Sequence, residues 1–219
     1  MAPFGTIYTY PNNPRVMKVQ AAARLNGLEI TEAPNFAMGK TNREPEFLAK
    51  FPLGKVPALA CSDGFNIWES DAIAQYVAES GPLAAQLVGS NPRERALIQQ
   101  WISFSSGEAL DPVTQLVLPR IGLRPFDASI EERNLDRLTR SLDCVEKHLQ
   151  NRAWLATDQL SLADISLAAA LFWGFSMVID AEMRAKYPKT VEWYKKVLGT
   201  EGVKEAFGEQ TMIEKRKQP

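Results

Sequence analysis

Residues 51–70, FPLGKVPALACSDGFNIWES, constrain the fold of this 219-residue chain more than any other stretch. Within twenty positions they hold a turn, two runs typical of β-strands and the start of a helix. The turn falls at Asp63 and Gly64, between the two strand-like runs. The oxygens of Glu69 and Ser70 then suit the first N–H groups of a helix. The stretch therefore predicts a β-hairpin that leads directly into a helix.

Strand-like and helical segments alternate before this hairpin. β-Branched and aromatic residues predict the first strand, and Gly27 suits the end of the first helix. The proline at position 52 ends a second, short helix. The expected order is β-α-β-α-β-β-α, with the segments at residues 5–10, 15–26, 28–33, 44–51, 58–60, 65–68 and 70–80.

Strand patterns disappear after residue 81, and helical patterns follow. Asn91 and Pro92 suit the N-cap and first position of a helix, and Pro112 predicts a kink or break in it. Ser129 and Glu132 form a further N-terminal signal, a capping box. We therefore expect an α/β domain over residues 1–81, a linker over residues 82–91 and an all-helical domain over residues 92–219.

A second capping box opens the most apolar segment, residues 165–179. Its residues are Ser161 and Asp164, to which we assign a structural role, since their oxygens satisfy helix N–H groups. The segment is too short and too closely flanked by polar residues to span a membrane, and it suits the centre of a helical bundle. The charged last residues, 214–219, are expected to fray.

Composition argues against several classes of function. The net charge is −1, with basic and acidic residues mixed, so nothing favours binding to nucleic acid or to an acidic membrane surface. The N-terminus has no basic region followed by an apolar run, which argues against secretion. Cys61 and Cys144 form no C-x-x-C pair, and the single His148 cannot complete a metal site with them. We expect a reduced, cytoplasmic protein without metal.

The sequence G-K-V-P at residues 54–57, followed by E-S at a helix start, resembles the glutathione-binding half of the glutathione transferase family. The resemblance implies a thioredoxin-like domain with a four-stranded mixed sheet and a cis bond before Pro57. It also implies that the Val56 backbone pairs with the cysteinyl backbone of glutathione, and that Lys55 meets the glycine carboxylate. Ser70 and the helix N–H groups would receive the γ-glutamyl carboxylate, and Glu69 would accept from the ammonium. Taken singly, the two motifs are also an ordinary loop before a strand and an ordinary N-cap.

A closer resemblance covers residues 39–48, 51–57 and 68–74, which look like the N-terminal domain of the gamma subunit of eukaryotic translation elongation factor 1B. That subunit continues through a lysine-rich linker into a second domain, whereas this sequence stops at Pro219. Two explanations stay open: an excised module of such a subunit, or a free-standing fungal-type transferase. The resemblance implies a homodimer and, under the first explanation, elongation factor subunits as partners.

Conjugation of glutathione requires a thiolate, whereas a free thiol has a pKa of about 8.5. The resemblance implies that a tyrosine or serine hydroxyl near the end of the first strand stabilises the thiolate, helped by the N-terminus of the next helix. Counting back from Arg15, the tyrosine position falls on Thr9 and the serine position near Pro11. Arg15 itself either favours the thiolate and binds a glutathione carboxylate, or forms a salt bridge between domains.

The residues around Thr9 offer other groups for the same role. Tyr8 and Tyr10 flank it, and they either act in the site or pack between strand and helix. Alternation along a strand sends both to the face opposite Thr9. The side-chain amide of Asn12 is a further hydrogen-bond donor for a thiolate. Our catalytic candidates are therefore Tyr8, Thr9 and Asn12.

Three functions are considered, the first two implied by the resemblances above. The first is a homodimeric glutathione transferase that conjugates glutathione, its co-substrate, to an electrophilic small molecule. The second is a non-catalytic interaction module of the elongation factor complex. The third, a thioredoxin-like redox protein, would need a reactive Cys61 and is disfavoured by the missing C-x-x-C motif. Four large residues of the helical half either line a site for the electrophile or belong to the core: Trp101, Phe104, Leu116 and Phe172.

Overall fold

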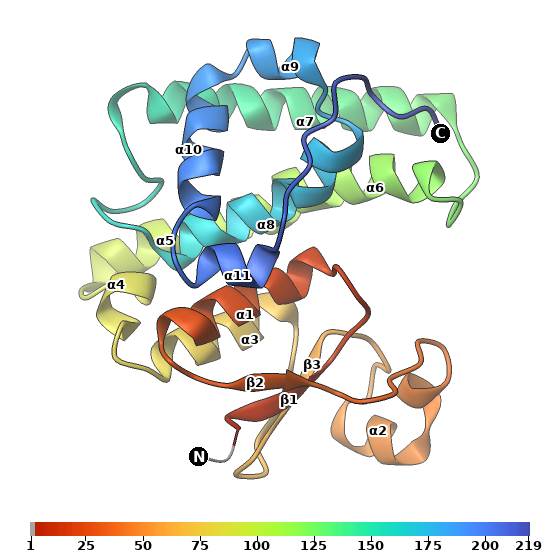
Figure 1. The fold of residues 1–219 in the computed structure, drawn as a ribbon, viewed down its shortest axis with the longest axis vertical. Coiled ribbons are helices and arrows are strands. Elements are labelled where there is room, and N and C mark those ends of the chain that lie inside the picture. The colour runs from red at the N-terminus through yellow and green to blue at the C-terminus, as the bar shows by residue number, and fades with distance from the viewer. Residues whose placement is uncertain (1–2) are drawn as a thin grey trace.

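Four strands form one mixed sheet in the order β2-β1-β3-β4, within a computed structural model that describes residues 3–219 (Figure 1). The strands are β1 (Gly5–Tyr8), β2 (Ile30–Glu32), β3 (Ala58–Cys61) and β4 (Asn66–Trp68). β1 runs parallel to β2 and antiparallel to β3, while β3 and β4 form the predicted antiparallel hairpin. The predicted four-stranded mixed sheet is thus confirmed, although β1 and β2 are shorter than residues 5–10 and 28–33.

Three helices accompany this sheet, namely α1 (Pro14–Leu25), α2 (Pro45–Lys50) and α3 (Ser70–Glu79), with a 3-10 turn η1 (Thr41–Arg43) before α2. Figure 1 shows α1 and α3 between the sheet and the helical half of the molecule, and α2 away from that half. The predicted order β-α-β-α-β-β-α is confirmed.

Alternation of side chains in β1 assigns neighbouring residues to two different cores. Ile7 is fully buried in the larger core, which includes residues of α1 and α3 and continues into the helical half. Tyr8 points to the opposite face and packs in a smaller cluster with Phe47 and Phe51, at α2. The larger core is continuous because α1 also packs against helices of the helical half.

The helical half follows the sheet in sequence and stacks on α1 and α3 (Figure 1). Its elements are α4 (Ala84–Val88), α5 (Pro92–Phe104), η2 (Ser105–Leu110), α6 (Asp111–Arg120), α7 (Ala128–His148), η3 (Leu149–Asn151), α8 (Leu162–Met177), α9 (Ala181–Ala185), α10 (Pro188–Leu198) and α11 (Val203–Phe207). The segment predicted as a linker, residues 82–91, contains α4, and the domain boundaries stay a prediction. None of the helices described within residues 3–219 is long and apolar enough to cross a membrane.

A π-helical turn, η2, separates α5 from α6 where the sequence predicted a kink or break at Pro112. Proline has no backbone N–H, so it cannot donate to the carbonyl four residues earlier, at Glu108. That carbonyl accepts instead from Ser141 Oγ of α7 at 2.5 Å, and the Gly107 carbonyl accepts from Arg137 Nη2 at 2.9 Å. The irregular turn therefore gives α7 two acceptors that a regular helix would have used internally.

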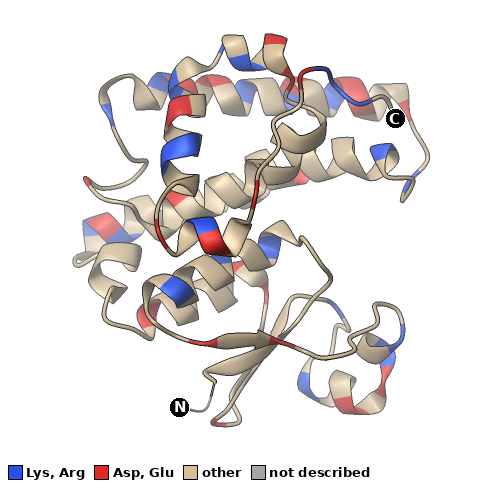
Figure 2. Ribbon diagram, in the orientation of Figure 1, with Lys and Arg blue, Asp and Glu red and all other residues tan. Residues whose placement is uncertain are grey.

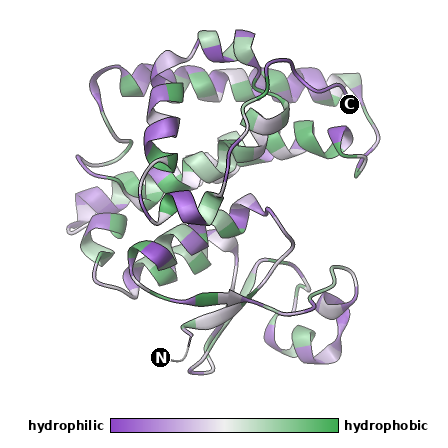
Figure 3. Cartoon of the chain, viewed as in Figure 1, coloured by the Kyte–Doolittle hydropathy of each residue, from purple (hydrophilic) through white to green (hydrophobic). Residues whose placement is uncertain are grey.

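The apolar helix α8 lies at the centre of the helical half, where Figure 3 shows it mostly green and Figure 2 almost free of charge. Its one charged residue, Asp164, is fully buried and forms the predicted capping box with Ser161. The same carboxylate accepts from the Leu155 N–H at 3.0 Å and from Trp193 Nε1 at 2.9 Å. Burial raises the pKa of the Asp164 carboxyl, and these donors oppose that rise. The predicted structural role of the box is confirmed.

The predicted start of α7 was wrong. The sequence assigned the cap to Ser129 and Glu132, whereas Asp127 is the N-cap residue. Its carboxylate accepts from the Ser129 N–H at 2.9 Å and the Ile130 N–H at 3.1 Å. A carboxylate at this position also interacts favourably with the positive end of the helix dipole, which explains why α7 begins earlier than predicted.

The C-terminal segment does not fray as predicted for residues 214–219. Backbone hydrogen bonds join it to the last turn of α8. The Ile213 N–H donates to the Phe175 carbonyl at 3.1 Å, and the Lys217 N–H donates to the Met177 carbonyl at 3.0 Å. The last carbonyls of a helix have no partner within the helix, so this segment caps the C-terminus of α8.

Candidate functional site

A pocket of about 320 Å³ opens where β1 ends, between α1 and the start of α3. It has walls from four stretches of the chain. Its lining residues are Tyr10, Arg15, Met38, Phe51, Leu53, Lys55, Val56, Pro57, Trp68, Glu69 and Ser70. Every residue predicted to bind glutathione is among them, so the structure brings together groups that lie up to 55 positions apart in the sequence, from 15 to 70.

The loop that carries Lys55 and Val56 is held by a buried asparagine. Asn42 donates from Nδ2 to the Gly54 carbonyl at 2.6 Å, and its Oδ1 accepts from the Gly39 N–H at 2.6 Å. Gly54 has a φ of 59°, and a Cβ there would lie 2.8 Å from the Asn42 carbonyl oxygen. Only glycine fits this close approach. The peptide bond between Val56 and Pro57 is cis, as expected from the resemblance.

Val56 lies just before β3 and lines the pocket. Within residues 3–219 its N–H and C=O have no hydrogen-bond partner. Free backbone groups beside a strand are a template for an added extended segment. An extended peptide could therefore pair with Val56.

The N-terminus of α3 also lines the pocket. Glu69 is the N-cap residue, with a φ of 71°, and makes no side-chain bond to the helix. The first intrahelical bond comes from the Ile73 N–H to the Glu69 carbonyl, so the earlier N–H groups of α3, from Ser70 on, have no partner in the helix. Such an uncapped N-terminus suits an anion, and Ser70 adds a hydroxyl to it.

Charges of both signs line the pocket: Arg15 and Lys55 are cationic and Glu69 is anionic. Tyr10 adds a phenol beside Arg15. Burial raises the pKa of Tyr10, and Arg15 partly opposes that rise, so the hydroxyl stays protonated at neutral pH and is a hydrogen-bond donor. The site therefore offers partners for two carboxylates and for one ammonium group.

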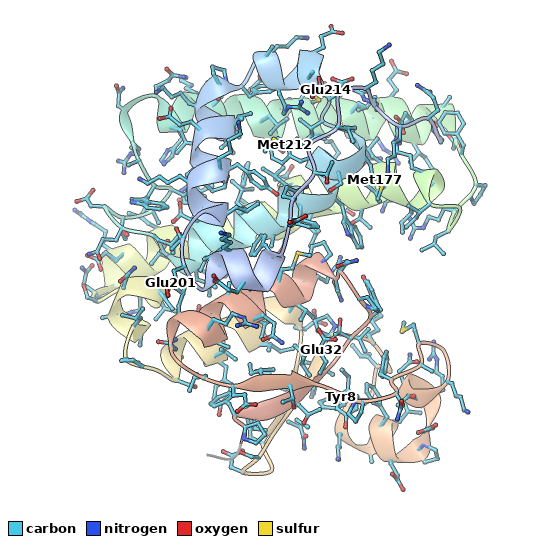
Figure 4. All side chains as sticks on the ribbon, viewed as in Figure 1. Tyr8, Glu32, Met177, Glu201, Met212 and Glu214 are labelled. Atoms are coloured by element: carbon cyan, nitrogen blue, oxygen red, sulfur yellow. The ribbon has the colours of Figure 1, made fainter. Side chains whose placement is uncertain are left out.

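Tyr8 lies outside this pocket lining, among the aromatic rings beside α2 (Figure 4). Its ring centroid is 5.2 Å from that of Phe47 and 5.8 Å from that of Phe51, both in edge-on geometry. Such pairs are typical of packed aromatic clusters. The structure thus places Tyr8 in a packing role between sheet and helix, one of the two alternatives stated above.

Thr9 and Asn12 also lie outside the lining residues. Thr9 is 7% exposed, and its hydroxyl donates to the Tyr10 carbonyl and accepts from Asn13 Nδ2. Asn12 is exposed, with a φ of 56°, and its carbonyl accepts from Trp173 Nε1 of α8 at 3.2 Å. That bond ties the turn between β1 and α1 to the helical half.

Sequence reasoning left Tyr10 undecided between the site and a packing role, and it did not include Met38, Phe51, Leu53 and Trp68 in the site. The alternation argument placed Tyr10 on the face opposite Thr9, but β1 ends at Tyr8 and strand alternation no longer applies to Tyr10. Trp68 directly precedes Glu69, and that adjacency was the available signal. Met38 belongs to an irregular loop whose position no local pattern indicates.

The other proposed functional groups lie in ordinary structural surroundings. Cys61 is buried in β3, where burial raises the pKa of its thiol, and it is therefore no reactive thiolate. Trp101, Leu116 and Phe172 belong to the buried core, and Phe104 packs against it. Among the described residues no group of three or more His, Cys, Asp and Glu side chains is placed to hold a metal ion.

Comparison with known proteins agrees with this architecture. Residues 3–79 match the N-terminal domain of glutathione S-transferases, and residues 109–201 match their C-terminal domain. The glutathione S-transferase-like protein LUC7 of Fusarium sp is 50% identical over 98% of this chain and 97% of that protein. Elongation factor 1-gamma of Danio rerio is 38% identical over 98% of this chain, which spans 48% of that protein.

Solved structures show the same fold. The GST-like domain of elongation factor 1-gamma from Saccharomyces cerevisiae superposes with a TM-score of 0.85 at 24% identity, over 100% of this chain and 99% of that one. Glutathione transferase URE2P6 from Phanerochaete chrysosporium, solved with oxidized glutathione, gives 0.84 at 23% identity, over 94% and 96%. A thioredoxin-like domain with a mixed sheet is followed by a helical domain in this architecture. The chain belongs to the glutathione S-transferase family.

Proposed function

We propose that this protein binds glutathione in the pocket at α3 and transfers the glutathione thiolate to an electrophilic small molecule. The observation that carries the proposal is that one pocket is lined both by Val56, whose backbone groups have no partner among the described residues, and by the uncapped N-terminus of α3. An extended, zwitterionic peptide with two carboxylates matches both features. Membership of the glutathione S-transferase family supports this choice of peptide.

In the proposed complex the γ-glutamyl carboxylate binds Ser70 and the free N–H groups of α3, and Glu69 accepts from the ammonium. The cysteinyl backbone pairs with Val56 as an added antiparallel strand beside Pro57. Lys55 meets the glycine carboxylate. With these contacts we expect the thiol to lie toward the start of α1.

Thiolate formation at neutral pH needs a pKa about two units below that of a free thiol, or about 2.7 kcal/mol of differential stabilisation. Tyr10 is a protonated donor that lines the pocket, and Arg15 supplies a positive charge beside it. In our proposal these two groups contribute more than Tyr8 and Thr9, whose side chains are engaged elsewhere. Asn12 stays a candidate, because it lies in the turn that precedes α1.

The proposal includes a cytoplasmic, homodimeric state. A second candidate function is a weakly catalytic or non-catalytic interaction module with elongation factor subunits as partners. Two findings favour it: the 38% identity to an elongation factor 1-gamma, and the TM-score of 0.85 to a domain of another. Partner binding without glutathione-dependent turnover would distinguish it from the enzyme.

The test is the initial rate of glutathione conjugation to a chlorodinitrobenzene-type electrophile, titrated in glutathione. We expect a saturable rate, and we expect Ser70→Ala to raise the KM for glutathione about tenfold, since it removes a hydrogen bond to a carboxylate. Ser103→Ala, an exposed serine on α5 outside the pocket lining, is the matched control and should leave the KM unchanged. No rate above the uncatalysed reaction, together with no heat of glutathione binding in calorimetry, would refute the proposal.

A further inference from the structure

A buried lysine connects three elements behind the proposed glutathione site. The side chain of Lys18, on α1, is 3% exposed, and its ammonium donates to Asp71 Oδ1 on α3. The other oxygen of the same carboxylate accepts from Ser106 Oγ, in η2, at 2.7 Å. The Asp71 carboxylate is thereby fixed by one charged donor from the N-terminal half and one neutral donor from the helical half.

Lys18 and Asp71 each lie close in sequence to a residue that lines the pocket. Asp71 follows Ser70 in the first turn of α3, and Arg15 precedes Lys18 by about one turn on α1. Ser70 and Arg15 both line the pocket, whereas Lys18 and Asp71 do not. The ion pair is therefore one residue away from the group that we propose binds the γ-glutamyl carboxylate.

Electrostatics at this helix N-terminus depend on Lys18. Two carboxylates, those of Glu69 and Asp71, flank Ser70, and without compensation both would repel a carboxylate ligand. Glu69 lines the pocket and is free to meet the ligand's ammonium. Asp71 is turned toward α1, where Lys18 neutralises its charge.

The burial of Lys18 is costly for the fold. Burial lowers the pKa of the lysine, while Asp71 opposes that change, so the ammonium depends on this carboxylate. The Asp71 side chain is 36% exposed, so the lysine bears most of the desolvation cost, and replacing such a desolvated charge by an apolar side chain together with its partner is often neutral or stabilising. Stability alone is therefore a poor reason for placing a lysine here, and a role in the adjoining site is a better one.

We infer that Lys18 is a positioning residue for glutathione binding: by neutralising and holding Asp71, it makes the first turn of α3 attractive to the γ-glutamyl carboxylate. The inference rests on the proposed function and extends it to a residue that does not touch the ligand. Ser106, in the helical half, donates a hydrogen bond to the same carboxylate. The helical half therefore helps to orient Asp71 relative to Ser70.

The test compares Lys18→Met, Asp71→Asn and the double variant with the intact protein, by glutathione-dependent turnover and by calorimetry with glutathione. Lys18→Met leaves the Asp71 charge uncompensated and should raise the KM for glutathione about tenfold, with kcat at saturating glutathione within about twofold. Adding Asp71→Asn removes that charge and should return the KM to within about twofold of the intact protein. Loss of packing alone would not be repaired by the second substitution.

The outcomes separate the inference from the proposed function. If the intact protein shows no glutathione binding, both are overturned. If the intact protein binds and Lys18→Met keeps its KM, or if the double variant stays tenfold weaker, the inference is overturned and the proposed function stands. Should Lys18→Met not fold, the double variant alone decides, because charge compensation predicts a KM close to that of the intact protein.

Discussion

Replacement of the buried carboxylate of α8 should be among the most damaging single changes in the helical half. Asp164→Ala removes the acceptor of four hydrogen bonds, from the N–H groups of Leu155 and Ser161, from Ser161 Oγ and from Trp193 Nε1, at 2.9–3.1 Å. A buried donor left without a partner costs about 1–3 kcal/mol. The donors share one acceptor and relax together, so we expect a loss of about 4 kcal/mol in the free energy of unfolding.

The assay is urea denaturation followed by far-UV circular dichroism, with the free energy of unfolding obtained by linear extrapolation. The matched control is Asp127→Ala, which removes the exposed N-cap of α7 and should cost only about 1 kcal/mol. Asp164→Asn should lie between the two, because it keeps the shape but has only one oxygen to accept. The reasoning is refuted if Asp164→Ala costs no more than Asp127→Ala.

Two further predictions concern backbone space and pH. Gly81→Ala should lower the free energy of unfolding by about 2–3 kcal/mol, because a Cβ there would lie 2.4 Å from the side chain of Asn26, which is held by its own hydrogen bonds. Gly107→Ala, with nothing within 4 Å, is the control and should gain about 0.5–1 kcal/mol; equal effects in urea denaturation would contradict the packing argument. Burial, together with the hydrogen bond to Asp143, raises the pKa of Tyr187 to about 12. The contribution of the Tyr187 hydroxyl to the free energy of unfolding is therefore complete below the unfolded pKa of about 10 and is lost as the pH rises through about 12. Tyr187→Phe should therefore flatten the fall in unfolding free energy above pH 10, measured by urea denaturation across that range, and an unchanged fall would exclude Tyr187 as its source.

Local patterns predicted most of the fold because they depend on neighbouring residues. The hairpin followed from two apolar runs around Asp63 and Gly64, and the starts of α5 and α8 followed from Asn91 and Ser161. The start of α7 was missed because several capping residues compete there, and Asp127 is the one whose carboxylate reaches two helix N–H groups. The C-terminal segment was missed because its partners are carbonyls of α8, more than thirty positions earlier.

The site residues, too, fall into those that local motifs predict and those that only the fold brings together. Lys55, Val56, Glu69 and Ser70 stand in short motifs that a sequence displays directly, and all of them line the pocket. The residues that follow β1 depend on where the chain leaves the strand, which no periodicity determines. Tyr10 therefore lines the pocket, whereas Thr9, to which residue counting pointed, does not. The Lys18 ion pair joins residues 53 positions apart and has no local signal at all.

The indole of Trp68 is a natural fluorescent probe for occupancy of the pocket. It lines the pocket and is 40% exposed, whereas Trp101 and Trp193 are buried, Trp154 is covered by Lys196 at 3.9 Å, and Trp173 is half-buried with its Nε1 bonded to the Asn12 carbonyl. An aqueous fluorescence quencher would therefore reach this indole more readily than the other four. A peptide that fills the pocket would shield it, so occupancy is measurable by emission from the unlabelled protein, even where no chemical reaction follows.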